Sequence, residues 1–218
     1  MSADAKIYKN VKIGKNVVIG NHVIIGLPPL GKKAGELETL IGDDSFIRSH
    51  TVIYAGNKIG NNFQTGHGVL IRESNAIGNN VSIGTHSVIE HDIAIEDGVR
   101  VHSNVFVPEF SVLKKNCWLG PNVVLTNALH PLCPALKKCI KGPLIGENSK
   151  ICANSTILPD IRIGKNSLVG AGSVVTKDVA DNTVAYGNPA KARGNVFDLE
   201  CPKGIIKRPY SAEKSRGD

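Results

Sequence analysis

A branched aliphatic side chain recurs at every sixth residue of this sequence, and this period constrains the fold more than any other feature. From Ile41 to Leu125 each sixth position is isoleucine, leucine or valine, apart from Thr65. The same phase begins the chain at Ile7, and a shifted phase runs from Ile145 to Val175. A fixed short period of this kind is the mark of a solenoid whose coils stack on one another. We therefore predict an all-β fold, a parallel β-helix solenoid of hexapeptide repeats.

The period also predicts which side chains face inward. Side chains alternate along a strand, so the aliphatic residue and the residue two before it point to the same side, as do Val69 and Ile71. Three short strands joined by corners would form one triangular coil of eighteen residues. Coils would stack at the strand spacing of about 4.8 Å. Residues eighteen apart should then form vertical files along each corner.

Three such files carry polar residues. The first file has ordinary turn chemistry, because Asn and Asp tolerate a left-handed backbone: Asn61, Asn79, Asp97 and Lys115. The second mixes hydroxyl and imidazole groups: Ser49, His67, Thr85, Ser103 and Pro121. The third, with Arg72 and Glu90 beside it, is rich in carboxylates: Ala55, Glu73, His91, Glu109 and Asn127. Turns alone do not require the side chains of the last two files, which are therefore candidates for function.

Two insertions and a tail interrupt the repeat. Loops 27–40 and 127–143 break the period, and the second begins where the acidic file ends. Loops projected by a rigid scaffold often hold ligands, so we expect loop 127–143 to carry His130 to the acidic file. We assign residues 1–194 to one β-helix domain and 195–218 to a C-terminal tail. Apolar tail residues are expected to cover the exposed edge of the solenoid: Val196, Phe197, Leu199, Ile205 and Ile206.

Composition excludes several classes of protein. The net charge is +7, but the basic residues are scattered and aromatic residues are only 5% of the chain, which favours small polyanionic ligands over nucleic acid. Five cysteines without paired CxxC spacing indicate reduced thiols rather than a zinc site, and no metal is expected. Neither a signal peptide nor a membrane-spanning run is visible, so we expect a cytoplasmic protein without a membrane partner.

The end of the repeat carries a family resemblance. Residues 168–194 (LVGAGSVVTKDVADNTVAYGNPAKARG), together with the hexapeptides from Ile41 onward, resemble the left-handed β-helix acyltransferases. The resemblance implies left-handed coils, an acyl-CoA co-substrate such as acetyl-CoA, and a homotrimer with active sites between subunits. The left hand comes from the resemblance alone, since most crossover connections between parallel strands are right-handed.

One segment points to two kinds of acceptor. In residues 120–131 (GPNVVLTNALHP), the first part resembles nucleotide-sugar N-acyltransferases, which acylate the amino group of a dTDP- or UDP-linked deoxysugar. The His130-Pro131 pair instead resembles galactoside and maltose acetyltransferases, whose loop histidine is the general base. Our main hypothesis is an acyl-CoA dependent N-acyltransferase, with an acetyl group as the expected acyl group, that acts on a nucleotide-linked amino sugar. The close alternative is O-acetylation of a sugar hydroxyl.

The chemistry of acyl transfer assigns roles to several residues. An amine that attacks a thioester must lose a proton, and a histidine with a pKa near neutrality can accept it. His130 is the first choice of base and His91 the second, with Glu109 orienting the amine or the imidazole. The predicted substrate-binding residues come from the family's acceptor side and from the polar files: Ser103, His102, Asn127, His67 and Glu73. The alternative for His67, His86 and His91 is packing at trimer contacts.

The resemblance also implies a coenzyme A site. Ala153 and Ala171 match small-residue positions where pantetheine approaches the backbone, and Gly170 keeps that approach open. Thr176, Lys177 and Lys191 match polar or basic positions near the nucleotide, where lysines offset phosphate charge. No phosphate-binding GxxxxGK[ST] loop is present.

Two further alternatives share the fold. The γ-class carbonic anhydrases bind zinc with three histidines at subunit contacts, and the spacing of His50, His86 and His91 is similar to theirs. Their upstream Arg, Asp and Gln signature is not evident in this sequence. A β-helix that serves only as a scaffold is the non-enzymatic alternative, and it would not bind acyl-CoA.

Overall fold

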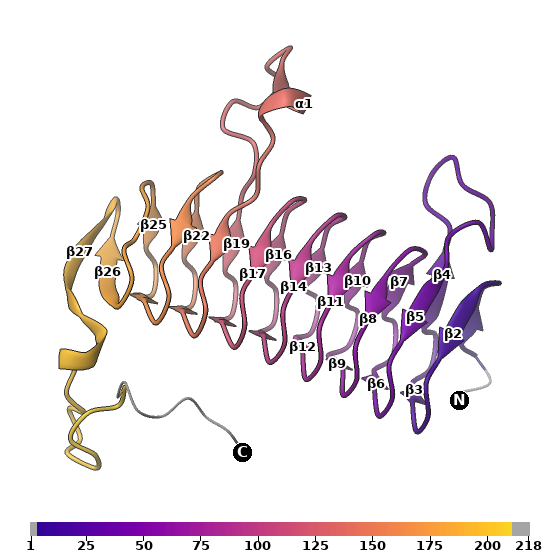
Figure 1. The fold of residues 1–218 in the computed structure, drawn as a ribbon, viewed down its shortest axis with the longest axis horizontal. Coiled ribbons are helices and arrows are strands. Elements are labelled where there is room, and N and C mark those ends of the chain that lie inside the picture. Colours follow the sequence, from indigo (N-terminus) through magenta and orange to yellow (C-terminus); the bar gives the residue numbers. More distant parts are fainter. Residues whose placement is uncertain (1–3, 211–218) are drawn as a thin grey trace.

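The computed structural model describes residues 4–210 and has the form of a three-sided stack of coils (Figure 1). Each coil places one short strand in each of three parallel sheets, here named A, B and C in chain order. Strand partners between the two loops are eighteen residues apart, as where Leu70 pairs with both Val52 and Val88. This arrangement confirms the predicted β-helix.

The strands of each sheet follow one another along the stack. Sheet A contains β1 (Lys6–Ile7), β4 (Ile24–Leu27), β7 (Val52–Tyr54), β10 (Leu70–Ile71), β13 (Val88–Ile89), β16 (Phe106–Val107), β19 (Val124–Leu125), β22 (Thr156–Ile157) and β25 (Val174–Val175). Sheet B contains β2 (Val11–Ile13), β5 (Thr39–Ile41), β8 (Lys58–Ile59), β11 (Ala76–Ile77), β14 (Ala94–Ile95), β17 (Val112–Leu113), β20 (Leu144–Ile145) and β23 (Arg162–Ile163). Sheet C contains β3 (Val18–Ile19), β6 (Phe46–Ile47), β9 (Gln64–Thr65), β12 (Ser82–Ile83), β15 (Arg100–Val101), β18 (Trp118–Leu119), β21 (Lys150–Ile151), β24 (Leu168–Val169), β26 (Thr183–Gly187) and β27 (Ala190–Asn195).

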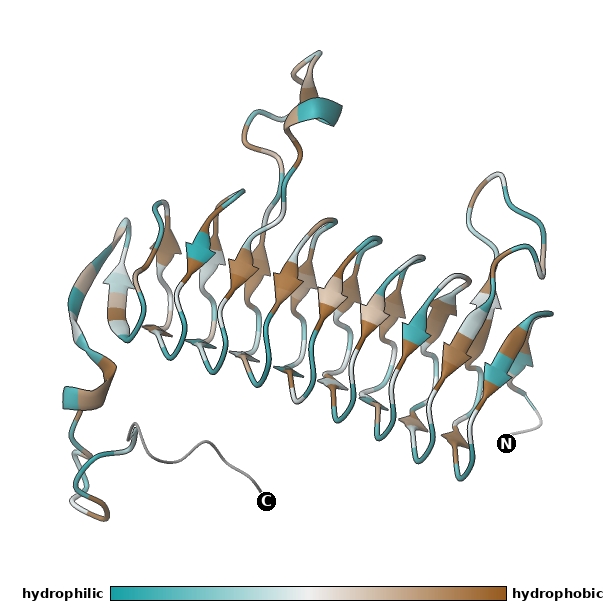
Figure 2. Ribbon diagram, in the orientation of Figure 1, coloured by the Kyte–Doolittle hydropathy of each residue, from teal (hydrophilic) through white to brown (hydrophobic). Residues whose placement is uncertain are grey.

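The interior is filled by the aliphatic residues that set the period. Val69 and Ile71 are both buried, which confirms the predicted inward pair. Figure 2 shows apolar residues concentrated on the strands and polar residues at the corners. Thr65, the exception to the period, is also buried, because its hydroxyl accepts a hydrogen bond from the Arg48 N–H at 2.9 Å and lies 3.2 Å from the Thr51 hydroxyl. A polar side chain is therefore accommodated in the core by local hydrogen bonds.

The corner between sheets B and C corrects one expectation. The left-handed residues are not in the file of Asn61 and Asn79 but one position later, as at Asn62 (φ 54°) and Asn80 (φ 57°). The side chains of the predicted file instead bond to the coil before them. The Asn61 N–H donates to Asn79 Oδ1 at 2.9 Å, and the Asn79 N–H donates to Asp97 Oδ1 at 2.6 Å. These residues therefore join neighbouring coils through hydrogen bonds, and the residues that directly follow them in sequence make the turn.

Both insertions leave the stack at the corner between sheets A and B (Figure 1). Residues 28–38 connect β4 to β5, and residues 126–143 connect β19 to β20. The second loop contains a single helical turn, α1 (Leu136–Cys139), with no buried residue. The corner between the two loops carries the acidic file, so the loops flank that file along the stack.

The C-terminal edge of sheet C is closed by a hairpin. β26 continues the sheet in parallel to β24, and β27 pairs antiparallel with β26. The η1 turn (Val196–Asp198) follows, and Val196 is buried. The prediction that the tail docks is wrong for Ile205 and Ile206, which are 78% and 52% exposed. Residues 211–218 of the predicted tail lie outside the described residues.

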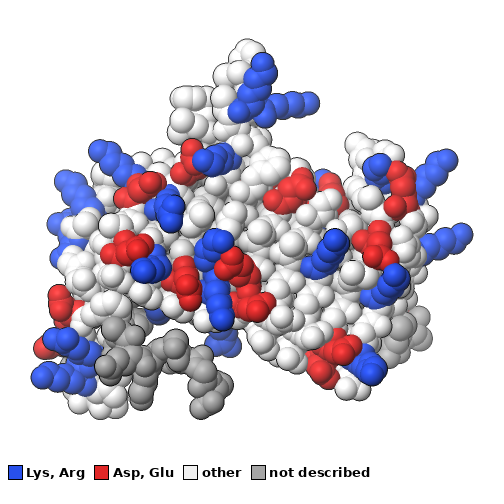
Figure 3. Space-filling model, viewed as in Figure 1, with Lys and Arg blue, Asp and Glu red and all other residues white. Residues whose placement is uncertain are grey.

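The surface is electrostatically mixed. Figure 3 shows acidic and basic side chains interspersed over the visible face, in agreement with the scattered charge of the sequence. Between residues 4 and 210, no helix combines the length and the apolar character needed to cross a bilayer.

Candidate active site

The acidic file forms a connected cluster at the corner between sheets A and B. We call the residues Glu73, Glu90, His91, Asp92 and Glu109 the acidic corner. The His91 Nδ1 lies 2.8 Å from Asp92 Oδ2, and its Nε2 lies 3.5 Å from Glu109 Oε1. The His91 side chain is 28% exposed, so the imidazole is half-buried but remains accessible. Asp92 therefore orients the imidazole through a hydrogen bond, and Glu109 faces the other ring nitrogen at a longer distance.

A neighbouring arginine holds the other two carboxylates of this corner. Arg72 makes two hydrogen bonds of 2.9 Å to Glu73 and one of 3.0 Å to Glu90 in the next coil. Burial by itself raises the pKa of Glu73, but the hydrogen bonds and charge of Arg72 outweigh it and hold that pKa below its ordinary value. The bonds to Glu73 raise the pKa of Arg72. Glu73 is therefore an ionised, engaged carboxylate rather than a free substrate ligand.

Two residues beside His91, Asp92 and Phe110, were not singled out from the sequence. Asp92 follows His91 directly, and its left-handed backbone (φ 55°) turns the carboxylate back to the imidazole. Phe110 is also left-handed (φ 64°), which is unusual for a bulky residue. Its ring lies edge-on to the His91 ring, with centroids 5.9 Å apart. The sequence signal for both is their position three residues after an aliphatic site, where the residues of most coils have a left-handed backbone.

The structure does not bring His130 to Glu109. Asn127, at the base of the loop, donates a hydrogen bond from Nδ2 to Glu109 Oε2. His130, three residues further along, is exposed, and its side chain has no hydrogen bond or ion pair to any residue that the structure describes. His91, the second choice of base from the sequence, is the histidine that contacts the acidic file.

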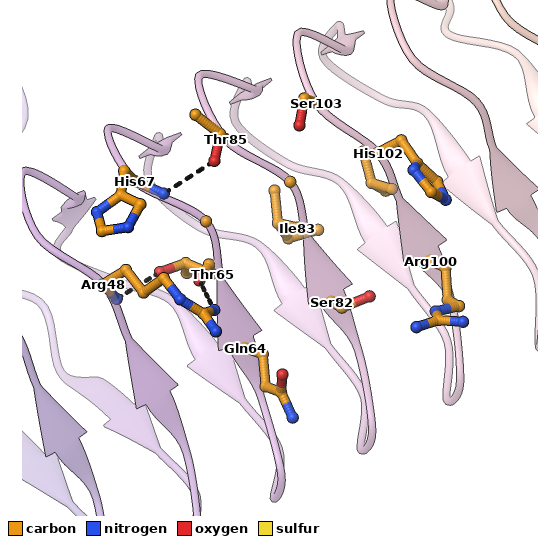
Figure 4. A pocket seen from close by; sticks show the side chains of 13 residues that line it. Arg48, Gln64, Thr65, His67, Ser82, Ile83, Thr85, Arg100, His102 and Ser103 are labelled. Carbon is orange, nitrogen blue, oxygen red and sulfur yellow. Dashed lines mark hydrogen bonds between the residues drawn. The ribbon is translucent and has the colours of Figure 1, made fainter.

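A second polar site lies on the outer face of sheet C. A shallow groove of about 300 Å³ runs across β9, β12 and β15 (Figure 4). We call it the cationic groove, and its charged and polar side chains include Arg48, Gln64, His67, Thr85, Arg100, His102 and Ser103. His67 Nδ1 lies 2.8 Å from the Ser49 hydroxyl. Three predicted substrate-binding residues, His67, His102 and Ser103, meet here.

His102 is the electrostatically perturbed residue of this groove. Its ring packs edge-on against Trp118, with centroids 4.7 Å apart. Burial, and then the charge of Arg100, lower the pKa of His102 below its ordinary value. His102 is therefore neutral at pH 7 and can accept as well as donate a hydrogen bond.

Within one chain, the two predicted halves of the substrate site stay apart. Ser103 precedes β16, at the corner between sheets C and A, whereas Glu109 follows β16, at the corner between sheets A and B. The width of sheet A separates them. A site that used both corners would need a second copy of the chain.

The predicted coenzyme A residues also divide between corners. Ala153 and Ala171 stack in successive coils beside sheet C, where the Gly172 N–H donates to the Ala153 carbonyl at 2.9 Å. Gly170 faces Tyr186, because an added Cβ there would lie 2.8 Å from the Tyr186 Cβ. Thr176 and Lys177 are exposed after β25, at the far edge of sheet A, and Lys191 is exposed on β27. Within one chain, these residues therefore lie on separate parts of the surface and do not surround a common ligand site.

The three histidines of the carbonic anhydrase alternative do not meet in one chain. His50 and His86 lie at the corner between sheets C and A, where the His50 ring stacks on His22 at 5.0 Å, and His91 lies across sheet A. In residues 4–210, no group of three His, Cys, Asp or Glu side chains is arranged as metal ligands. All five cysteines are free thiols.

Comparison with known proteins identifies the repeats. Residues 142–177 match the family model described as bacterial transferase hexapeptide (six repeats), and residues 75–108 match hexapeptide repeat of succinyl-transferase. The UDP-N-acetylglucosamine acyltransferase structure from Bacteroides fragilis covers 89% of this chain and 74% of its own, at 20% identity and a TM-score of 0.50. That likeness supports the fold alone. The chain therefore contains hexapeptide repeats and has the left-handed β-helix fold that the resemblance implied.

Curated relatives are similar over shorter segments. Galactoside O-acetyltransferase from Lactococcus lactis is 45% identical over 85 residues, which are 37% of this chain and 41% of that protein. The dTDP-3-amino-3,6-dideoxy-alpha-D-galactopyranose 3-N-acetyltransferase of Aneurinibacillus thermoaerophilus is 47% identical over 53 residues, which are 24% of this chain and 28% of that protein. The chain thus spans less than half the length of either relative. An acetyltransferase of sugar hydroxyls and one of a nucleotide-linked amino sugar are both among its relatives.

Proposed function

We propose that this protein is an acetyl-CoA dependent acetyltransferase that transfers the acetyl group to a sugar hydroxyl. The observation that carries the proposal is the half-buried His91 imidazole, held between Asp92 and Glu109 in a hexapeptide β-helix. The similarity to galactoside O-acetyltransferase favours a hydroxyl acceptor over the amine of our main sequence hypothesis.

The geometry suggests how the proton moves. Asp92 accepts a hydrogen bond from the His91 Nδ1–H, so the unprotonated nitrogen is Nε2. Nε2 faces Glu109 at 3.5 Å, and a hydroxyl that enters beside Glu109 can give its proton to this nitrogen. The hydroxyl oxygen then bonds to the thioester carbonyl carbon, and collapse of the tetrahedral intermediate releases coenzyme A as its thiolate. The thiolate recovers the proton from His91. Glu109, braced by Asn127, stabilises the imidazolium during this exchange.

His130 is the alternative base in this proposal. The loop that carries it projects from the acidic corner, and the exposed His130 side chain, which bonds to no residue between 4 and 210, can meet a substrate or a neighbouring subunit. In that case His91 and Glu109 would bind and orient the acceptor. Single substitutions of the two histidines separate these roles, as argued in the Discussion.

The co-substrate site is proposed at the C-terminal coils. Ala153, Gly170 and Ala171 would line the pantetheine arm, and Thr176, Lys177 and Lys191 would face the phosphates. The match of residues 142–177 to the transferase hexapeptide model supports this location, since most of these residues lie within or next to it.

We further propose a homotrimer with its active sites between subunits. The separation of the two polar corners by sheet A supports this assembly, because only a second copy could join a C–A corner to an A–B corner. The outer face of sheet A is apolar and partly exposed at Phe106 (37%) and Val124 (38%), as a surface that packs against another subunit would be.

N-acetylation of a dTDP- or UDP-linked amino sugar is the second candidate function. The cationic groove favours it, because a nucleotide-linked acceptor carries phosphate charge that a simple galactoside lacks. The similarity to the dTDP-amino sugar N-acetyltransferase supports the same choice.

An acceptor panel tests both functions. Purified protein would be incubated with acetyl-CoA and, in turn, galactosides, maltose, and dTDP- and UDP-linked sugars with and without an amino group. Release of free thiol would be measured against a reaction without acceptor. Turnover of sugars without an amino group supports the first function, and turnover of amino sugars supports the second. No turnover with any acceptor would contradict both.

A further inference from the structure

The charged side chains that line the cationic groove are all positive. Its thirteen lining residues include two arginines, Arg48 and Arg100, and no aspartate or glutamate. The acidic corner across sheet A has the opposite character. Such a groove attracts an anionic ligand and disfavours a cationic one.

Neither arginine of the groove is engaged by a carboxylate. Arg72 forms three hydrogen bonds to glutamates, but Arg48 and Arg100 have no ion pair with any residue in the described part of the chain. The Arg48 guanidinium is nevertheless oriented, because Nη1 donates to the Thr65 carbonyl at 2.7 Å and the group lies over the Phe46 ring at 4.8 Å. A positioned guanidinium with unused donors suits phosphate oxygens, which it can bind in a bidentate way.

The hollow between the arginines follows from small residues. Arg48 and His102 occupy the same file three coils apart, and the two residues between them are Gly66 and Gly84. Ser82 separates Gln64 from Arg100 on the neighbouring file (Figure 4). Three coils span about 14 Å at the sheet spacing, which leaves room for a diphosphate and part of the sugars bonded to it.

We propose that the cationic groove binds the diphosphate of a nucleotide-linked sugar, with Arg48 and Arg100 as its phosphate ligands. The proposal rests on the acetyltransferase function above and narrows its acceptor to sugars that carry a nucleoside diphosphate. Gln64, Thr85 and Ser103 supply neutral hydrogen-bonding groups beside the two guanidinium groups. Coenzyme A also contains a diphosphate, so the test must separate the two sources.

Binding measured without catalysis provides that test. Isothermal titration calorimetry would compare UDP, dTDP and CoA as probes for the wild type and for Arg48→Gln, Arg100→Gln and the double variant. Each loss of a charged hydrogen bond should weaken UDP or dTDP binding by roughly tenfold, and both losses together by roughly a hundredfold. CoA affinity should stay unchanged. Raising the salt concentration should weaken nucleotide binding to the wild type more than to the double variant.

Arg162→Gln is the matched control. Arg162 lies on the exposed side of β23 in sheet B, away from the groove, and it too has no ion pair among residues 4–210. Its substitution should leave UDP and dTDP binding unaltered. The Arg100 side chain makes no hydrogen bond in that part of the chain, and its backbone N–H, which donates to the Cys117 carbonyl, is kept in the variant. Arg100→Gln should therefore keep the wild-type melting temperature even if Arg48→Gln disturbs Thr65.

Three outcomes would overturn the proposal. These are no measurable binding of UDP or dTDP to the wild type, equal affinity in the wild type and double variant, and loss of CoA affinity in place of nucleotide affinity. The last would assign the groove to the co-substrate. Failure of acetyl transfer with all acceptors would contradict the proposed function, yet nucleotide binding that depends on both arginines would still establish the diphosphate site.

Discussion

Glu109 Oε1 lies 3.5 Å from His91 Nε2, although the two residues come from successive coils. The contact exists because both side chains follow an inward aliphatic residue by two positions, so the repeat stacks them in one file. Asn127 extends the file by one coil and binds the other oxygen of Glu109. The loop with His130 begins at that residue, which links the candidate base to the point where the period is broken.

Substitution of the two histidines should distinguish their roles. If His91 is the base, His91→Ala should lower kcat by roughly a hundredfold or more and alter the pH dependence of kcat. His130→Ala should then change mainly KM, and its kcat should follow the same pH profile as the wild type. The measurement is steady-state thiol release from pH 5.5 to 9. A large fall in kcat in His130→Ala, with His91→Ala close to the wild type, would exchange the two assignments.

The buried asparagines beneath the acidic corner should matter more for stability than those on the outside. Asn75 Oδ1 accepts the Ile93 N–H at 2.8 Å, and both groups are buried. Asn75→Ala leaves that N–H without a partner and should reduce the free energy of unfolding by about 2 kcal/mol. Asn79→Ala removes a similar bond to the Asn61 N–H, but that N–H is exposed and water replaces the lost oxygen, so the expected change is below about 1 kcal/mol.

Urea unfolding at one protein concentration measures this difference, since the stability of the proposed trimer would depend on concentration. Both variants should keep the wild-type m-value if the native fold is retained. Equal destabilisation by the two substitutions would show that burial does not increase the contribution of the Asn75–Ile93 hydrogen bond to stability.

Much of the architecture could be predicted because the period of six and the alternation of side chains act on every coil in the same way. The inward pair Val69 and Ile71 and the shared file of His91 and Glu109 both follow from counting residues. The counting places Asp92 and Phe110 as well, but it does not reveal that a left-handed turn directs their side chains back to His91.

The two arginines of the cationic groove and the position of His130 could not be predicted, because they depend on interactions that no period encodes. Arg48 and Arg100 lie three coils apart in different positions of the hexapeptide, so only the structure shows that they border one hollow. The conformation of loop 127–143 depends on contacts within the loop. His130 is therefore exposed on this loop and does not contact the acidic file, as the sequence had suggested it would. Ile205 and Ile206 are apolar, but the hairpin of β26 and β27 already covers the edge that they were expected to protect.

The electrostatics of the cationic groove can be measured through His102. Burial and the charge of Arg100 lower the pKa of His102, so Arg100→Gln should move it up towards the ordinary value of 6.5, though not all the way, because the ring stays buried. NMR titration of the histidine ring protons between pH 4 and 8 gives the pKa directly. Arg162→Gln should leave it in place. An unchanged pKa in Arg100→Gln would show that the guanidinium charge does not reach the imidazole and would weaken the case for a concentrated positive field.

The acidic corner should also set the stability of the protein at low pH. The pKa of Glu73 is lowered in the folded state by Arg72, whose hydrogen bonds and charge overcome the effect of burial. A carboxyl with a lowered folded pKa contributes stability that is complete above its unfolded pKa of about 4.5 and is lost as the pH falls towards the folded value. Glu73→Gln should therefore destabilise the protein at pH 7 and reduce the loss of stability between pH 5 and pH 3. Urea unfolding at these three pH values tests the sign, with Asp44→Asn, an exposed left-handed corner residue, as the control. A Glu73→Gln variant that loses as much stability on acidification as the wild type would place the acid sensitivity elsewhere in the chain.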